Sequence, residues 1–373
     1  MGFRLSGSLP FDRLQAPFER ASDALARLDE RLRSSPVAGA FVVRAHFHDA
    51  CAALWRVGEF VHIEDLVLHD AGMDVRSPTH ELIRAHAVLR ARRRIASREP
   101  EWALTTSGLA ALRGARTFGD TSLRQTVKIR CLDEGDPEEL DFERLDDEAM
   151  ATGEFEDIDA LLTRTSRPTS PIERSSLRRD DSGLVYDDDW DEEARLSEWR
   201  EHLKEHEALP PLMAAGLALD AWETLEPLQH RAWQGPLLTA ALLRARGKTR
   251  HHLAALHAGF RHAKYRRSPQ QDLATRLTAF AQSVEVMANL DLKELDRLTL
   301  AREILFRKCN GRRTNSKLPR LVELCLGSPI VTVPLAAKEV RVSQQAATTM
   351  IGELASNLRE LTGRGRYRAW AVL

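Results

Sequence analysis

Apolar residues recur at steps of three and four through most of this 373-residue chain. The stretch FDRLQAPFERASDALARLDERLR, residues 11–33, shows the spacing clearly, with apolar side chains at Phe11, Leu14, Phe18, Ala21, Leu25 and Leu28. An α-helix has about 3.6 residues per turn, so these side chains share one helix face. Similar spacing continues through residues 37–115 and 191–308. The sequence therefore predicts a mainly α fold.

Composition limits the class of protein and its compartment. Hydrophobic residues make up 43% of the chain and aromatic residues only 6%, which allows large cores and favours helices over sheets. The four cysteines are scattered, and the nearest two, Cys309 and Cys325, are 16 positions apart, so we expect free thiols in a reducing cytosol. The N-terminal MGFRLSGSLPFDRLQ lacks the apolar centre of a signal peptide, and we expect a cytoplasmic protein without a membrane span.

The net charge of −1 hides a strong asymmetry. Residues 132–193 hold 23 acidic and 6 basic side chains, whereas residues 301–373 hold 13 basic and 5 acidic ones. A basic end suits a polyanion, above all nucleic acid. The acidic block is typical of a solvated linker.

Four regions follow from these patterns. Residues 1–115 form an N-terminal helical region, residues 116–190 an acidic linker or mobile insertion, residues 191–308 a second helical core, and residues 317–373 a C-terminal domain. Two helix starts can be predicted from N-cap residues: Ser77 followed by Pro78, and Asp191 before an acidic first turn.

The last 57 residues follow the plan of a winged helix-turn-helix. IVTV (330–333) reads as a short strand, PLAAKEV (334–340) as a short helix, and SQQAATTMIGELASN (343–357) as a longer helix capped by Ser343. Two strands then flank the turn GRGR (363–366). In a helix-turn-helix, the second helix enters the major groove of DNA.

The residues expected to contact double-stranded DNA lie on this second helix and on the hairpin. The polar face of the helix carries Ser343, Gln344, Gln345, Thr348 and Thr349, opposite an inner face of Ala346, Met350, Ile351 and Leu354. Glutamine can pair bidentately with adenine, and Ser or Thr can reach bases or phosphates. The hairpin adds Arg364, Arg366 and Arg368, which alternate and so share one strand face. The alternative is a winged helix that serves packing or dimerisation.

Two histidine clusters and one basic loop are further candidate sites in the sequence. His46 and His48 are two residues apart, and HHLAALHAGFRH (251–262) offers spacings that do not match the i, i+4 pairs of metal sites. CNGRR (309–313) reads as a basic linker. We therefore expect no metal and no cofactor, and the sequence indicates no cofactor-binding residue.

The segment LPPLMAAGLALDAWETLEPLQHRAWQGPLLTAALLRARG (209–247) resembles the core of the Fic family. Members of that family carry a loop HPFxxGNGR between two apolar helices, and longer members end in a winged helix. The resemblance covers most of the chain apart from residues 116–190. It implies a helical core and transfer of a nucleotidyl group to a protein hydroxyl, with the loop histidine as base.

The departures from the Fic pattern fall on its chemistry. Glu226 stands where the histidine is expected, and Trp233 stands among the lost glycines, where its side chain would obstruct a phosphate. We therefore expect a body that is not an enzyme and that serves dimerisation or ligand sensing. One alternative is a divergent AMP transferase that uses Glu226 as base. Another is a non-catalytic interaction module, in which the acidic segment 132–193 masks the basic end.

The combination of regions also resembles a rhizobial family in which a domain of unknown function is joined to a helix-turn-helix DNA-binding domain. That resemblance implies DNA binding and supplies no mechanism. The leading prediction is a transcriptional regulator with double-stranded DNA as partner, with no membrane partner and with a homodimer as one expected assembly. The sequence names no small-molecule or nucleotide effector.

Overall fold

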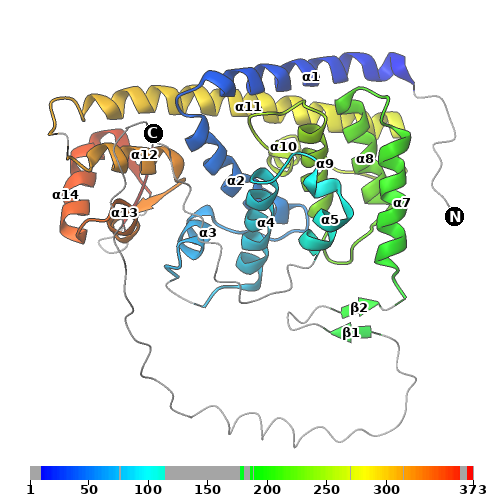
Figure 1. The fold of residues 1–373 in the computed structure, drawn as a ribbon, viewed down its shortest axis with the longest axis horizontal. Coiled ribbons are helices and arrows are strands. Elements are labelled where there is room, and N and C mark those ends of the chain that lie inside the picture. Colours follow the sequence, from blue (N-terminus) through cyan, green and yellow to red (C-terminus); the bar gives the residue numbers. More distant parts are fainter. Residues whose placement is uncertain are drawn as a thin grey trace, which may run out of the picture. The chain divides into compact units, whose positions relative to one another are not determined.

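A computed structural model describes residues 10–74, 77–113, 177–179, 185–187, 189–268, 270–313, 315–361 and 368–372. Met1–Gly119 and Trp190–Leu373 form one compact unit, and Asp120–Asp189 form a second. In the second unit, strand β1 (Leu177–Arg179) pairs antiparallel with β2 (Val185–Asp187). The first unit contains the helical body and the C-terminal domain (Figure 1).

The body of the first unit is entirely helical in its described residues. Its elements are α1 (Phe11–Ser34), α2 (Ala38–Trp55), α3 (Ile63–Asp70), α4 (His80–Ala96), the 3-10 turn η1 (Trp102–Leu104), α5 (Thr106–Arg113), α7 (Glu192–Glu205), α8 (Pro211–Leu225), α9 (Gln234–Ala245), α10 (Leu256–His262) and α11 (Leu273–Arg307). Helices from both sides of the acidic stretch contribute to one hydrophobic core. No helix among the described residues is long and apolar enough to cross a membrane.

The C-terminal domain follows α11. It consists of α12 (Leu318–Gly327), β3 (Val331–Thr332), α13 (Val333–Val340), α14 (Gln344–Leu354), the 3-10 turn η2 (Ala355–Asn357), β4 (Leu358–Glu360) and β5 (Ala369–Val372). The three strands form an antiparallel sheet in the order β3-β5-β4. The mainly α fold with a C-terminal winged helix-turn-helix, expected from the sequence, is confirmed.

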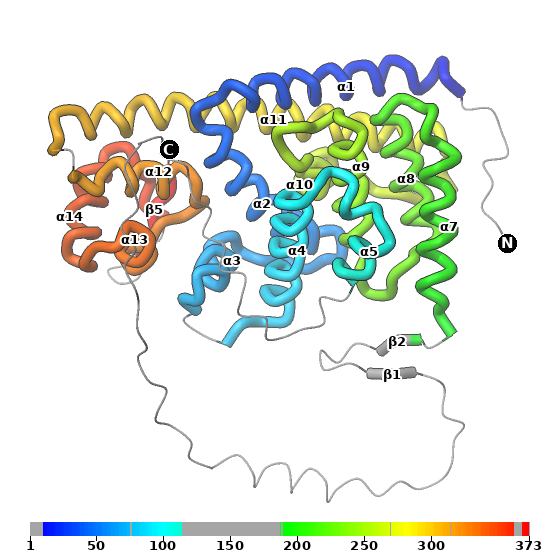
Figure 2. Tube along the Cα trace, in the orientation of Figure 1, coloured from blue at the N-terminus to red at the C-terminus, as the bar shows by residue number. Residues whose placement is uncertain are grey.

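Helices α1 and α11 lie side by side along the whole of α1 (Figures 1 and 2). Arg13 pairs with Asp272 at 2.8 Å near both N-terminal ends, and Arg31 pairs with Asp296 at 2.5 Å further along both helices, so the pair is parallel. The buried residues of α1 follow a four-three repeat: Leu14, Phe18, Ala21, Leu25, Leu28 and Leu32. Such a repeat keeps one apolar seam facing a neighbouring helix. Phe11, which the sequence places on this face, is instead 54% exposed, because the seam begins with Leu14.

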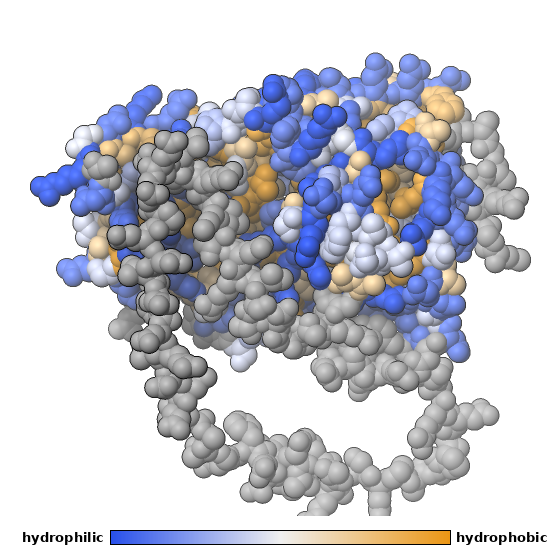
Figure 3. Space-filling view, viewed as in Figure 1, coloured by the Kyte–Doolittle hydropathy of each residue, from blue (hydrophilic) through white to orange (hydrophobic). Residues whose placement is uncertain are grey.

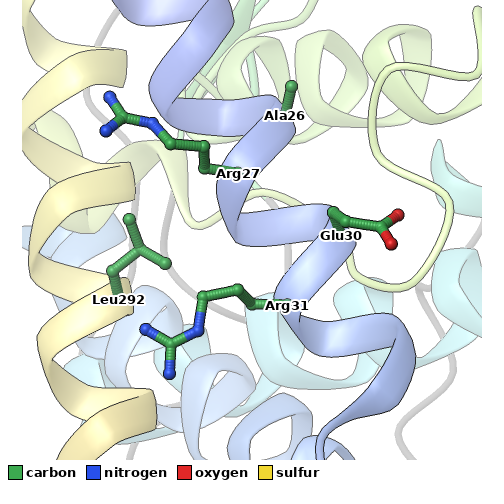
Figure 4. A pocket seen from close by; sticks show the side chains of 5 residues that line it. All are labelled: Ala26, Arg27, Glu30, Arg31 and Leu292. Atoms are coloured by element: carbon green, nitrogen blue, oxygen red, sulfur yellow. The ribbon is translucent and has the colours of Figure 1, made fainter.

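A shallow groove runs along this helix pair. Figure 4 shows Arg27 and Arg31 extending from α1 toward α11, with Leu292 of α11 between their side chains and Glu30 pointing away. The stems of the two arginines cover apolar surface while their charged ends remain in solvent. Hydrophilic residues likewise predominate on the described part of the face in Figure 3, and apolar ones are seen mainly in recesses between helices. The groove is therefore an ordinary solvated helix–helix seam.

The start of α4 corrects one prediction from the sequence. Thr79, not Ser77, is the N-cap, because its hydroxyl accepts a hydrogen bond from the backbone N–H of Leu82 at 3.3 Å. The helix begins at His80, so Pro78 lies outside it. The predicted cap at Asp191 is confirmed: its carboxylate accepts from the N–H of Ala194 at 2.9 Å.

Two arginines of the body, Arg44 and Arg297, hold the winged helix by donating hydrogen bonds to its backbone oxygens. Arg44 of α2 is 5% exposed and donates both to the backbone oxygen of Ser328 at 2.8 Å and to Glu294 of α11 at 3.1 Å. Arg297 bonds the same glutamate and donates to the backbone oxygen of Val372 at 2.8 Å. Two points of the C-terminal domain, Ser328 after α12 and Val372 of β5, are thus bonded to arginines that share one carboxylate on α11.

Candidate nucleic-acid interface

A three-residue turn, Arg341–Ser343, joins the two helices of the helix-turn-helix. Thr332 caps α13 by accepting a hydrogen bond from the N–H of Leu335 at 3.3 Å. The helix ends at Val340, and its C-cap, Arg341, lies in the left-handed region at φ 60° and ψ 59°. Ser343 then caps α14 by accepting from the N–H of Ala346 at 3.2 Å. The predicted capping role of Ser343 is confirmed, and capping hydroxyls stabilise a helix start by about 1 kcal/mol.

The inner face of α14 agrees with the prediction at Ile351 and Leu354 and differs from it at Ala346 and Met350. Ala347, Ile351 and Leu354 are buried, at spacings of four and three residues, and pack into the domain core. Ala346 and Met350, which the sequence places inside, are only half-buried. The prediction omitted Ala347 because each helical step rotates a side chain by about 100°, so small residues at neighbouring positions are hard to rank.

The outer face of α14 presents polar side chains to solvent. Gln344, Gln345, Thr348 and Thr349 are all exposed, as is Gly352 one turn further on. The hydroxyls of Thr348 and Thr349 donate to the backbone oxygens of Gln344 and Gln345, at 2.8 and 3.0 Å. Within the described part of the chain, the two glutamine amide groups form no hydrogen bond. They keep their full donor and acceptor capacity, and contact with DNA stays a prediction.

Only one of the three predicted wing arginines can be placed, because Arg364 and Arg366 lie outside the described residues. Arg368 precedes β5 and donates from Nε to Glu360 at 2.8 Å, with a second bond to the same carboxylate. Its guanidinium also lies over the ring of Trp370, 5.1 Å from the centroid. The hydrogen bond from Arg368 lowers the pKa of Glu360. Arg368 would therefore exchange a carboxylate for any phosphate that it binds.

Several exposed basic residues of this domain were not singled out from the sequence. Their side chains form no ion pair with any described residue: Arg313, Lys317, Arg320, Arg341 and Arg359. The sequence indicates them only through the excess of 13 basic over 5 acidic residues in residues 301–373. Such an excess does not show which of the basic residues are exposed and unpaired. Unpaired surface cations are the groups that can neutralise phosphates.

Other basic residues of the domain serve its packing. Lys338 of α13 donates to the backbone oxygen of Ala71, just after α3, at 2.6 Å. Arg312 pairs with Glu353 of α14 at 2.6 Å. These contacts fix the helix-turn-helix against the body and the linker, so not every positive charge here is available to DNA.

The Fic-like prediction concerns the connection between α8 and α9, residues 226–233, which we name the α8–α9 loop. Glu226, where the Fic base would stand, ends α8 in the left-handed region at φ 44°, and its carboxylate is exposed. Its backbone oxygen accepts a hydrogen bond from the Trp190 indole at 3.2 Å. Pro227 and Leu228 are buried beneath it. The first half of the loop therefore places Glu226 in solvent and Pro227 and Leu228 in the core.

Hydrogen bonds from the body hold the second half of this loop. Arg231 and Gln234 both donate to the backbone oxygen of Leu112, at 3.2 Å each. The backbone oxygen of Trp233 accepts from Nε2 of His257 at 2.9 Å. At Gly235, the next residue into α9, an added Cβ would lie 2.3 Å from the Trp222 ring. Close packing of α8 on α9 is thus the structural reason for that glycine.

A buried polar network lies under the loop and is named here the Asp49 network. Asp49 accepts from Arg92, from Nδ1 of His257 at 2.9 Å and from the backbone N–H of Ala258 at 2.9 Å. Both nitrogens of His257 face oxygen acceptors, so the ring satisfies both only as the charged imidazolium. Arg92 also donates to the backbone oxygen of Leu253 at 2.9 Å. These contacts tie α2, α4 and α10 together beneath Trp233.

Two carboxyls of this region have opposite pKa shifts. Burial alone would raise the pKa of Asp49, but the charges of Arg92 and His257 and the hydrogen bonds from His257 and the Ala258 backbone lower it to about 2. At Asp291 of α11, burial, reinforced by the charge of Asp49, outweighs the opposing charge of Arg92 and raises the pKa to about 7. Its Oδ2 atom is buried and has no hydrogen-bond partner among the described residues. A neutral carboxyl is the expected state of Asp291 at mildly acidic pH.

Two histidines of the candidate clusters in the sequence, His46 and His252, are buried in structural surroundings. Burial, with the nearby charge of Arg92, lowers the pKa of His46 well below its usual value. His252 bonds the carboxylate of Asp29 at 3.0 Å. Burial would raise the pKa of Asp29, but the hydrogen bonds from His252 and two backbone N–H groups lower it to about 2. These groups stabilise the body rather than present ligands to solvent.

The arrangement of helix, strand, helix, turn, helix and hairpin, with a polar outer face on α14, defines a winged helix-turn-helix DNA-binding domain. Comparison with known families agrees, since the model of an HTH DNA binding domain matches residues 318–373. A second model, described as a protein of unknown function (DUF1612), matches residues 184–310 and so spans α7 to α11.

The uncharacterized protein y4cF of Sinorhizobium fredii (strain NBRC 101917 / NGR234) is similar along nearly its whole length. It is 43% identical over 370 residues, which cover 96% of this chain and 97% of the relative. The chain therefore belongs to the same family, in which a DUF1612 region precedes a helix-turn-helix DNA-binding domain. The resemblance to Fic proteins stays a prediction.

Proposed function

We propose that this protein is a sequence-specific transcriptional regulator that reads double-stranded DNA with α14. The observation that carries the proposal is the outer face of α14, where Gln344 and Gln345 expose unbonded amide groups at the start of the helix. The first residues of a recognition helix are those that reach base edges. A bidentate pair of glutamine with adenine contributes about 1–3 kcal/mol of discrimination between bases.

Phosphate contacts supply the remaining affinity in this proposal. Arg341 lies in the turn, Lys317 and Arg320 lie at the start of α12, and Arg359 lies on β4; each of these side chains is exposed. Binding should weaken steeply with salt, because each neutralised phosphate releases about 0.9 condensed counterion.

The helical body holds the winged helix in place and is not a catalyst in this proposal. Support comes from the α8–α9 loop, whose backbone oxygens accept hydrogen bonds from Trp190 and His257. The side chain of Arg231 in this loop donates to the body, and the Glu226 carboxylate is exposed. The roles expected for the body, dimerisation or ligand sensing, would act on DNA binding through the junction of Arg44, Glu294 and Arg297 with the winged helix.

The decisive experiment is selection of binding sites from random duplex DNA, followed by anisotropy titrations with the full chain. We expect a defined site, and at least a tenfold loss of affinity for it in the double variant Gln344→Ala, Gln345→Ala. The matched control is Gln15→Ala with Gln282→Ala, two exposed glutamines of the body, which should leave affinity unchanged. Unchanged specific binding by the first variant would show that α14 does not read the DNA.

A thermal-shift series with ATP, GTP, CTP and UTP tests the non-catalytic body. A ligand at 100 times its dissociation constant stabilises a protein by about 2.7 kcal/mol, so a bound nucleotide is easily detected. We expect no shift. A shift that Glu226→Gln or Arg231→Ala abolishes would instead support the divergent transferase.

A further inference from the structure

The last turn of α7 and its C-cap residue, His206, bring together two histidines and a glutamate within HLKEH, residues 202–206. One ligand atom from each of His202, Glu205 and His206 lies within 4.8 Å of the others. Residues i, i+3 and i+4 of a helix share one face, which is the spacing that metal-binding helices use. We propose that these three side chains bind a divalent transition-metal ion, with zinc as the expected species.

The distance between two of the ligand atoms fits a tetrahedral ion. Nδ1 of His202 and Oε2 of Glu205 are 3.3 Å apart. Zinc binds nitrogen and oxygen ligands at about 2.0–2.1 Å, which places two ligands of a tetrahedral centre about 3.3–3.4 Å from each other. An ion can therefore sit between these two atoms without a shift of the helix backbone.

The tautomer of His206 suits metal binding. Its Nδ1 donates to the backbone oxygen of His202 at 2.7 Å, so the proton of the neutral ring is on Nδ1. The lone pair is then on Nε2, the other ring nitrogen. Metal-ligating histidines almost always donate their second nitrogen to a carbonyl or carboxylate, which fixes the ring.

The helix end that carries the site is held from two sides. Trp199, one turn before His202, donates from its indole to the backbone oxygen of Ala218 in α8 at 2.9 Å. After the site, Arg246 donates to the backbone oxygens of Glu207 and Leu209, at 2.7 and 2.9 Å. Ordering this segment costs little on metal binding, because it is already fixed.

The exposed side of the site allows an ion to enter from solvent. The side chain of His202 is 7% exposed and that of Glu205 is 64% exposed, so the site lies at the boundary between core and solvent. Three protein ligands leave the fourth position of a tetrahedral ion to water. Two imidazoles and one carboxylate favour zinc, cobalt or nickel over magnesium or calcium, which prefer oxygen ligands alone.

The sequence-based expectation of no metal site rested on the histidines at 46–48 and 251–262, whose spacings are unsuitable. His202 and His206 have the i, i+4 spacing that fits. This site lies in the region matched by DUF1612, and it is independent of the DNA-binding proposal.

Calorimetric titration of the chelator-treated full chain with zinc chloride tests the site. We expect one ion per chain, and at least tenfold weaker binding in His206→Gln and in Glu205→Gln. These two positions are chosen because they lie toward solvent, whereas His202 is buried and its replacement would disturb the fold. His251→Gln and His262→Gln change exposed histidines outside the site and are the matched controls, expected to bind zinc like the wild type.

Cobalt absorption provides a second readout. Tetrahedral cobalt bound by the wild type should give visible bands that His206→Gln loses and that both controls retain. Absence of stoichiometric binding to the wild type would overturn the proposal. Equal affinity in His206→Gln and the wild type would do the same, because the ion would then be held elsewhere.

Discussion

The α8–α9 loop and the α13–α14 turn are both short links between packed helices, and both hold non-glycine residues in the left-handed region. Glu226 and His230 do so in the loop, and Arg341 does so in the turn. They differ in where the neighbouring polar groups are bonded. The loop is bonded to the body through Leu112, Trp190 and the Asp49 network, whereas the turn leads into side chains that remain unbonded on the surface.

This difference separates structural polar groups from recognition groups. A buried polar group must find a partner inside the protein, since leaving it unpaired costs about 1–3 kcal/mol. A group that recognises a partner must instead stay available. Crowding of polar residues in a sequence, as in EPLQHRAWQ (226–234), does not distinguish the two cases, and their hydrogen bonds do.

The largest expected effect comes from breaking the network under the loop. Asp49→Ala leaves the cation of Arg92 buried without its carboxylate, and we expect a loss of about 3–5 kcal/mol in the free energy of unfolding. Urea denaturation followed by circular dichroism measures it. Glu30→Ala removes one partner of the exposed pair with Arg33 and is the control, expected to have a much smaller effect because solvent screens this pair. Equal effects of both variants would show that the network is not structural.

The next effect depends on pH and concerns Asp291. Its carboxyl titrates near the usual value of 3.8 in the unfolded chain and near 7 in the folded one. Below about pH 4 both states are protonated; between about pH 4 and 7 only the unfolded state ionises, so stability falls as pH rises. Asp291→Asn should remove this loss and be more stable than the wild type by about 2–4 kcal/mol at pH 8.

Denaturation of both forms at pH 5 and pH 8 checks this prediction. Asp49, Arg92 and Glu294 act on the same carboxyl, so the difference between the two forms isolates the share of Asp291. The difference should shrink at pH 5. A difference that does not change with pH would mean that Asp291 titrates normally.

Smaller effects compare the two left-handed residues directly. Arg341→Gly and Glu226→Gly should each stabilise the protein by about 1 kcal/mol, because glycine adopts positive φ without strain. Only Arg341→Gly should also weaken DNA binding, equally for all sequences, and lower the slope of log K against log salt by about 1. Thermal unfolding and titrations at several salt concentrations measure both quantities. A loss of DNA affinity in Glu226→Gly would show that the α8–α9 loop also contributes to DNA binding. The loop and the α13–α14 turn would then not differ in function.

The smallest effect is expected at Gly352. No atom lies within 4 Å of an added Cβ there, so Gly352→Ala should stabilise α14 by about 0.5–1 kcal/mol. The methyl group would project from the outer face, seven residues after Gln345. We expect DNA affinity to fall despite the gain in stability, because the helix then approaches DNA less closely. Unchanged affinity would place Gly352 outside the contact surface.

Much of the helical fold follows from the sequence, because each amphipathic helix is encoded locally. The caps at Asp191 and Ser343 and the order of the C-terminal elements were predicted in this way. The start of α4 was not, since Ser77 and Thr79 are both good caps and only the bond to Leu82 decides between them. Parallel pairing of α1 with α11 joins residues about 260 positions apart, and no local pattern indicates it.

The candidate sites were less predictable than the fold. Exposure of Gln344 and Gln345 follows from helical spacing, but the ion pair of Arg368 with Glu360 depends on how β4 and β5 are paired. The role of Asp49 depends on α4 and α10, which meet α2 only in the folded chain. Sequence spacing can show that side chains share one helix, as in HLKEH. It cannot show that side chains from three different helices meet in one cluster.

Helix α11 limits where residues can be inserted into the chain. Its 35 residues contain no glycine or proline, and at about 1.5 Å per residue it is a continuous rod of about 52 Å that begins beside α8 and ends before the winged helix. One residue inserted into this rod would rotate everything beyond it by about 100°. If the insertion came before Glu294, then Glu294 and Arg297 would turn away from their present partners. The contact of Glu294 with Arg44 and that of Arg297 with Val372 would then be lost. Relatives of this protein should therefore tolerate insertions in loops while keeping the rotational phase of α11 constant.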